Sequence, residues 1–75
     1  PNLLLNIAKY EHSNNLMPGI QAGDILAHAF TAAVDRRDSR TLYNIASYEG
    51  SYNLMPGIGA DSIRNEARRI EYGGY

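Results

Sequence analysis

The chain repeats itself, and this repetition constrains its fold more than any other feature. Segment 6–20 returns as 44–58 at a constant offset of 38 residues, and fourteen of the twenty-one positions from 5 to 25 are identical to their partners. The best-preserved part is Asn-Leu-Met-Pro-Gly-Ile, which begins at Asn15 and again at Asn53. A period of this length is typical of a supersecondary unit that covers its apolar face only by stacking on a neighbour. We therefore expect two pseudo-symmetric repeats, residues 1–37 and residues 38–75.

The spacing of apolar residues predicts an all-α fold of four short helices. After Asn2, which we expect to be an N-cap, apolar residues recur at helical intervals as Leu4, Ile7 and Ala8. A long ordered Leu-Met-Pro-Gly-Ile loop follows, because its proline and asparagines do not continue a helix. Asp24 is the expected cap of the second helix. That helix has one broad apolar stripe, formed by Ile25, Leu26, Ala29, Phe30, Ala33 and Val34.

The second repeat reproduces this helix-loop-helix pattern with a more polar last helix. We expect Ser39 to cap the third helix and Asp61 or Ser62 to start the fourth, which ends near Glu71. The fourth helix has only three apolar residues at core spacing, Ile63, Ala67 and Ile70. A repeat array usually needs about three units for stability. Because the second helix is more apolar than one short neighbour can cover, we predict that part of its surface is left for other chains.

Composition narrows the classes of function. Cysteine is absent, which excludes disulfides, thiolate zinc sites and cysteine nucleophiles. Seven basic and eight acidic residues give a net charge of −1, which argues against nucleic acid as a partner. His12 and His28 lack a histidine or carboxylate three or four residues later, so we expect neither a metal nor a cofactor. No apolar run approaches the roughly 20 residues that span a bilayer, and we expect a soluble chain, cytoplasmic or virion-associated.

Loop and surface chemistry indicates contacts with protein partners. Six tyrosines, and six arginines against one lysine, are a bias typical of interfaces. Tyr10 and Tyr48 occupy equivalent positions and are expected to be structural. Whether the loops are presented to a partner or close a small core is open on sequence grounds. The candidate partner-binding residues are Leu16, Met17, Pro18, Ile20, Leu54, Met55, Pro56, Ile58, Tyr52, Tyr72, Tyr75, Arg64 and Arg68.

These observations favour a non-enzymatic structural or adaptor subunit that packs on larger protein partners in a multi-subunit assembly or homo-oligomer. By analogy, a viral cement, capsid-associated or tail-associated protein fits this description. One alternative is a small helical module that binds a peptide or ligand as a monomer, with the two loops lining a groove. An enzyme is the weaker alternative, because its only candidate acids or bases are Glu11, Glu49 and His12.

Overall fold

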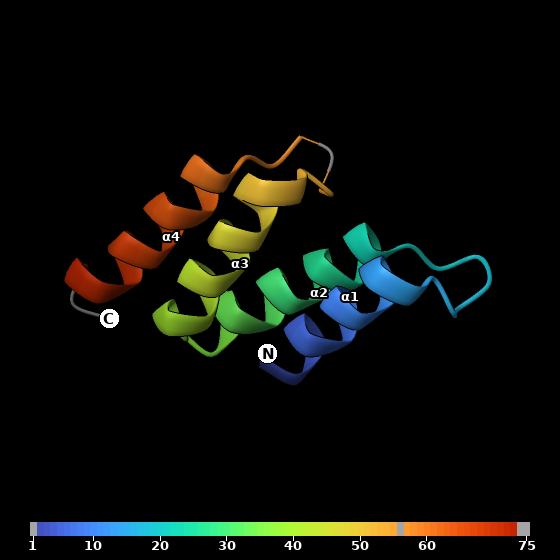
Figure 1. The fold of residues 1–75 in the computed structure, drawn as a ribbon. Helices are drawn as coiled ribbons and strands as arrows, with labels where there is room; N and C mark the ends of the chain where they lie inside the picture. The colour runs from blue at the N-terminus through green and yellow to red at the C-terminus, as the bar shows by residue number, and fades with distance from the viewer. Residues whose placement is uncertain (1, 56, 74–75) are drawn as a thin grey trace.

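The computed structural model contains four helices, arranged as two hairpins (Figure 1). The structure describes residues 2–55 and 57–73, and these residues form no β-strand. The all-α fold with helix-loop-helix pairs is therefore confirmed. The first hairpin pairs α1 with α2, and the second pairs α3 with α4. The helices are α1 (Asn2–Asn14), α2 (Ala22–Asp35), α3 (Ser39–Tyr52) and α4 (Ala60–Tyr72).

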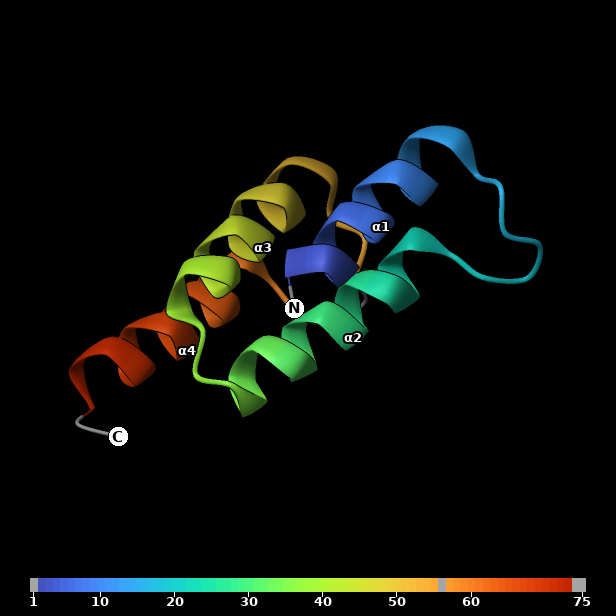
Figure 2. The same ribbon diagram turned by 90° about the horizontal axis from the view of Figure 1, so that it is seen from below.

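The two hairpins stack through α2 and α3, so that α1 and α4 are the outer helices (Figures 1 and 2). Weaker contacts join α1 to α3 and α2 to α4. The molecule is elongated, with principal extents of 41 × 19 × 15 Å. In both views the α1–α2 loop projects at one end of the molecule, and the C-terminal end of α4 lies at the other. This arrangement resembles a short two-unit stack, in which each hairpin has one inner and one outer side.

Most of the apolar stripe of α2 is used inside the molecule. Leu26, Ala29 and Ala33 have no exposed surface, and Ile25 is also buried. These side chains belong to one core that includes Leu5, Ala8, Leu42, Ile45, Ala46, Met55, Ile63 and Ala67. α2 lies between α1 and α3, which cover most of the stripe, and the apolar surface that α2 still exposes is limited to its half-buried residues such as Phe30 and Val34.

The helix starts differ from the expected ones by one to three residues. α2 begins at Ala22 after Gln21, whose side chain makes no capping hydrogen bond, so Asp24 is not the cap. Asp24 instead lies in the first helical turn, where a carboxylate interacts favourably with the helix dipole. Similarly, α4 begins after Gly59 and places Asp61 in its first turn. Backbone geometry, and not a side-chain cap, starts both second helices of the hairpins.

The junction between the repeats has a side-chain cap, but it is Asp38 and not Ser39. The carboxylate of Asp38 accepts a hydrogen bond from the backbone N–H of Thr41 at 3.2 Å and one from its hydroxyl at 2.6 Å. These bonds hold the pKa of Asp38 below its ordinary value of 3.8. Ser39 is the first helical residue of α3, and Asn2 is likewise already inside α1. The chain reverses here at Arg37, which has a positive φ of 54°.

Candidate functional site

A buried carboxylate closes the loop of the second hairpin. The side-chain oxygens of Glu49 accept hydrogen bonds from the backbone N–H groups of Leu54 and Met55, at 2.8 to 3.1 Å. Asn53 ends α3 in the left-handed conformation, with φ of 53°, and Gly57 has φ of 75°. Asparagine and glycine are the residues that adopt this region most easily. The loop sequence therefore supplies the turns, and Glu49 fixes the backbone between them.

The first hairpin uses the same device at the equivalent residues. Glu11 accepts hydrogen bonds from the backbone N–H groups of Leu16 and Met17 at 2.9 to 3.1 Å. Asn15 and Gly19 have φ values of 52° and 76°, close to those of their partners in the second loop. The two loops thus share the left-handed conformation of these asparagines and glycines. In both repeats, a glutamate one turn before the end of the helix holds the start of the loop through hydrogen bonds to its backbone N–H groups.

The two glutamates act as structural anchors in this geometry. Glu11 and Glu49 are both buried, with 3% and 1% of their surface exposed. A carboxylate that receives several backbone N–H bonds has the strong, charge-assisted partners that a buried charge needs. Among the described residues, no buried side-chain nitrogen or oxygen atom lacks a hydrogen-bond partner. The carboxylates considered above as acid–base candidates are thus occupied by loop amides.

An aromatic cluster joins the two repeats at α1 and α3. Nδ1 of His12 lies 2.8 Å from the hydroxyl of Tyr48, and the His12 ring also contacts Tyr52 at a centroid distance of 4.6 Å. The rings of Tyr48 and Tyr52 are 4.7 Å apart, and the ammonium of Lys9 lies 5.5 Å from the centre of the Tyr48 ring. Burial raises the pKa of Tyr48, and the nearby Tyr52 adds to the effect. His12 is therefore a contact between repeats.

The first helix leaves an apolar surface open. We define the α1 face as Leu3, Ile7, Tyr10 and Leu16, of which Leu3 is 72% and Leu16 62% exposed. Leu3, Ile7 and Tyr10 lie along one side of α1 because they are spaced by four and three residues. Leu16 comes from the loop, where the Glu11 carboxylate accepts hydrogen bonds from the backbone N–H groups of Leu16 and Met17.

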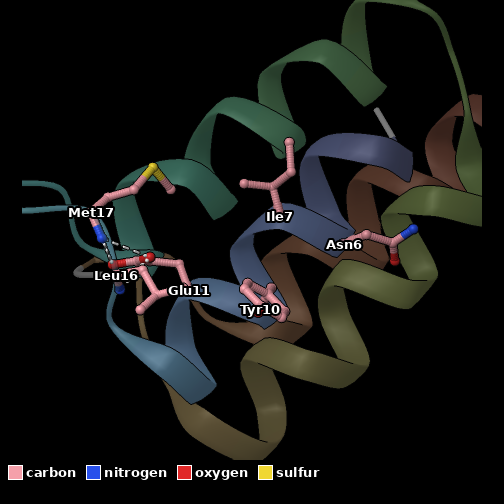
Figure 3. A pocket seen from close by; sticks show the side chains of 6 residues that line it. All are labelled: Asn6, Ile7, Tyr10, Glu11, Leu16 and Met17. Atoms are coloured by element: carbon pink, nitrogen blue, oxygen red, sulfur yellow. Dashed lines mark hydrogen bonds between the residues drawn. The ribbon is translucent and has the colours of Figure 1, made fainter.

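An open groove of roughly 350 Å³ runs along this face (Figure 3). Its lining combines three residues of the α1 face with three neighbours, and the close-up shows Glu11 and Met17 joined at the loop end. The lining residues are Asn6, Ile7, Tyr10, Glu11, Leu16 and Met17. Because most of these side chains are apolar, the groove suits an apolar occupant.

The equivalent surface of the second repeat is covered by the first repeat. Ile45 is fully buried, whereas its partner Ile7 is 39% exposed. The other equivalents of the α1 face are more enclosed as well, because Thr41 is buried and Tyr48 and Leu54 are half-buried. The difference follows from position in the stack, since the first hairpin packs against α3, whereas no helix among the described residues covers the α1 face. The same sequence thus forms a core in one repeat and a free surface in the other.

The loop residues predicted to bind a partner divide between the two repeats. In the first loop, Leu16, Pro18 and Ile20 are exposed and Met17 is half-buried. In the second loop, the residues face the core: Met55 is buried and Leu54 and Ile58 are half-buried. Pro56 and Tyr75 lie outside the described residues. The second loop therefore packs toward the core, whereas the first loop is exposed and its contact with a partner stays a prediction.

The predicted tyrosine and arginine contacts do not form one surface with the loops. Tyr72 is 82% exposed on α4, and Tyr52 is half-exposed beside His12. Arg64 pairs with Asp61 at 2.6 Å, and Arg68 lies 3.5 Å from the side-chain oxygen of Asn65. Tyr10, expected to be structural, is exposed, whereas its equivalent Tyr48 is packed.

Sequence reasoning missed the helical part of the α1 face. Ile7 belongs to the apolar spacing that predicts the first helix and Tyr10 was expected to be structural, but both are exposed, as is Leu3. The signal in the sequence was the width of the apolar surface around α1, because Leu4, Leu5 and Ala8 already form an apolar stripe beside these residues. A short helix that is apolar over so wide an angle can bury all of this surface only by packing against two neighbouring elements.

A second hollow of roughly 360 Å³ lies between the two loops. Its lining is mostly polar and comes from both repeats: Glu11, His12, Asn15, Gln21, Ala22, Gly23 and Leu54. If the protein were instead a module that binds a peptide or ligand between the two loops, the ligand would bind in this hollow. Gly23 belongs to this lining, and a Cβ at that residue would overlap the carbonyl oxygen of Leu54.

The chain matches no protein family, no curated protein and no solved structure with which it was compared. Within the described residues, no group of three or more histidine, aspartate or glutamate side chains is placed to hold a metal ion. None of the described helices is long and apolar enough to cross a membrane. The open α1 face and its groove are therefore the features from which function is argued.

Proposed function

We propose that this protein is a non-enzymatic assembly subunit that binds a protein partner through the α1 face. The observation that carries the proposal is the contrast between Ile7 and Ile45, which are 39% and 0% exposed at equivalent positions. In the second repeat, where the first hairpin packs on α3, the surface equivalent to the α1 face is buried. An exposed apolar patch with a groove, rimmed by polar residues, is typical of a protein-binding surface.

The geometry also supports the adhesive character of the proposed interaction. Leu16 and Met17 are held at the end of the groove by Glu11, so the loop does not need to be ordered on binding. A preformed surface loses less conformational entropy when a partner binds. Tyr10 adds a large apolar ring with a polar tip, which suits the rim of an interface. Membership in a virion stays a prediction.

The first test is the mass and helicity of the purified chain across a wide concentration series. We expect light scattering to show association through the α1 face, and the melting temperature to rise with concentration. The variant with Leu3→Gln, Ile7→Gln and Leu16→Gln should remain helical, since these side chains are exposed, and should stay monomeric. Tyr72→Gln, which replaces an exposed aromatic side chain on α4, is the control and should associate as the unmodified chain does.

A monomer at every concentration, with a cooperative melt that does not depend on concentration, would contradict this proposal. It would favour the second candidate, a monomeric module that binds a peptide or ligand in the hollow between the loops. The residues of that hollow, His12, Asn15 and Gln21 among them, would then be the ones to vary.

A further inference from the structure

The internal repeat indicates what kind of partner the α1 face accepts. Resting on the proposed function, we infer that its partner presents a helical hairpin of the α1–α2 type, whose second helix carries an apolar face with a glycine at its start. The equivalent face of the second repeat is covered by such a hairpin, the first repeat itself. The surface is therefore shaped to continue the stack of hairpins.

The helix α2 shows which features this docking requires. Gly23, in its first turn, lies so close to the second loop that any side chain would overlap the carbonyl group of Leu54. One turn later, Leu26 is completely buried, and Phe30 packs half-buried against the same core. Glycine allows the close approach and the two large side chains fill the space behind it. A partner helix on the α1 face needs the same three features opposite Leu16 and Ile7.

The other end of the molecule lacks these features, so a second copy does not continue the stack, and the self-association expected of the purified chain joins one α1 face to another. At the positions of Gly23, Leu26, Phe30 and Ala33, α4 carries Asp61, Arg64, Arg68 and Glu71. Arg64 and Asp61 form an ion pair on the surface of the helix. Terminal repeats of stacked proteins have such a polar outer side. The α2 helix of a second copy is also not available, because its own α3 covers it. The stack therefore grows from the α1 side only.

The test is a chain with a third hairpin. Residues 2–39 are repeated in front of Asn2 of the full chain, which keeps the 38-residue register and places Ser39 before Asn2. The added copy also carries Leu3→Gln, Ile7→Gln and Leu16→Gln, so that it does not create a new open face. The matched control has the same design with Leu26→Arg and Phe30→Arg in the added copy, the residues that α4 has at these positions.

We expect the three-hairpin chain to be monomeric and to melt as one unit at a higher temperature than the unmodified chain. The arginine control should fold as a hairpin, as α4 does with α3, but leave the melting temperature and the association of the original repeats unchanged. An equal rise for both chains would overturn the inference, since it would show that the chemistry of the second helix does not matter.

A three-hairpin chain that still associates and melts at the original temperature would also overturn it, and would show that a second copy covers the α1 face. The proposed function would survive this result, because the unmodified chain would still associate through that face. Failure of the proposed function is recognised separately, by an unmodified chain that stays monomeric at every concentration.

Discussion

At the scale of single residues, the most informative side chains are the two buried glutamates. Glu11 and Glu49 each bind two consecutive backbone N–H groups of a loop whose sequence is otherwise apolar. Their hydrogen bonds fix the leucine and methionine at the start of each Leu-Met-Pro-Gly-Ile segment, which has few polar side chains of its own. They also explain why a glutamate recurs at this position of both repeats.

Replacing these glutamates should destabilise the protein unequally. Glu49→Ala leaves the N–H groups of Leu54 and Met55 without partners near the core, and we expect a loss of about 3 kcal/mol. Glu11→Ala should cost about 1 kcal/mol, because water can reach the more exposed first loop at Leu16. Urea unfolding of both variants measures the difference. If both variants lost the same free energy of unfolding, the different burial of the two loops would not determine how much each glutamate stabilises the protein.

Asp38 gives the junction between repeats a dependence on pH. Its pKa is lower in the folded protein because it accepts hydrogen bonds from Thr41. The folded state therefore binds fewer protons, so this contribution to stability is present above the ordinary pKa of 3.8 and is lost as the pH falls through the lowered value. We expect Asp38→Ala to cost about 1 kcal/mol at neutral pH.

The measurement is the urea midpoint of both chains from neutral to acidic pH. The difference between the original chain and Asp38→Ala should shrink below about pH 4. Ser39→Ala is the control, since the Ser39 hydroxyl makes only a 3.4 Å contact with Glu71 and does not cap α3. A larger effect of Ser39→Ala would restore serine as the cap.

At the scale of elements, two glycines that look alike in the sequence have opposite roles. Gly23, near the start of α2, lies against the backbone of Leu54, and a Cβ there would overlap its carbonyl oxygen. Gly50, within α3, has ordinary space for a Cβ, with Ala60 3.5 Å away. Glycine is thus required at the contact between hairpins and only tolerated inside the helix.

Alanine substitutions test this distinction directly. Gly23→Ala should destabilise the protein by about 2 kcal/mol, because the hairpins must separate to admit the methyl group. Gly50→Ala should stabilise it by up to about 1 kcal/mol, because alanine favours the helix. Thermal unfolding followed by circular dichroism distinguishes the two. A Gly23→Ala chain as stable as the original would mean that the stacking of α2 on the second loop is looser than described.

The helices were predictable and their starts were not. Apolar spacing located all four elements, since Ile25 to Val34 and Ile63 to Ile70 repeat at helical intervals. The caps were assigned to polar side chains, but Gln21 and Gly59 begin their helices through backbone conformation alone. A serine or aspartate near a helix start does not reveal whether its side chain reaches the backbone N–H.

The site was predictable only in part, because the sequence does not state which neighbour each repeat has. Leu16 and Leu54 belong to identical loop segments and each follows an asparagine with nearly the same positive φ, yet Leu16 is exposed and Leu54 is half-buried. Ile7 and Ile45 differ in exposure as well. Whether these residues are exposed depends on which hairpin lies next to them in the stack, and this cannot be predicted from the local sequence.

At the scale of the whole molecule, stability should decrease from the centre of the stack outward. The central helices α2 and α3 each contact all three other helices, whereas α1 and α4 each pack mainly on the other helix of their own hairpin. In stacked repeats each unit is stabilised mainly by adjacent units, so the ends open first. We expect backbone N–H groups of α2 and α3 to exchange most slowly with deuterium.

Native-state hydrogen exchange followed by mass spectrometry checks this order. The N-terminal half of α1 should exchange fastest among the helices, because Leu3 and Ile7 are exposed there. The variant with glutamine at Leu3, Ile7 and Leu16 should leave the slow exchange of α3 unchanged. Uniform exchange of all four helices would indicate a single cooperative core and contradict the picture of stacked units.

The unequal burial of the twin loops has a practical consequence for chemistry at sulfur. Met17 and Met55, at equivalent positions, are the chain's two methionines, but Met17 is partly accessible and Met55 is 2% exposed. Peroxide converts an accessible thioether to the sulfoxide. Met17 should therefore be oxidised first while Met55 serves as an internal standard. The ratio of the two sulfoxides then reports, in any mixture, how much of the α1 groove is occupied.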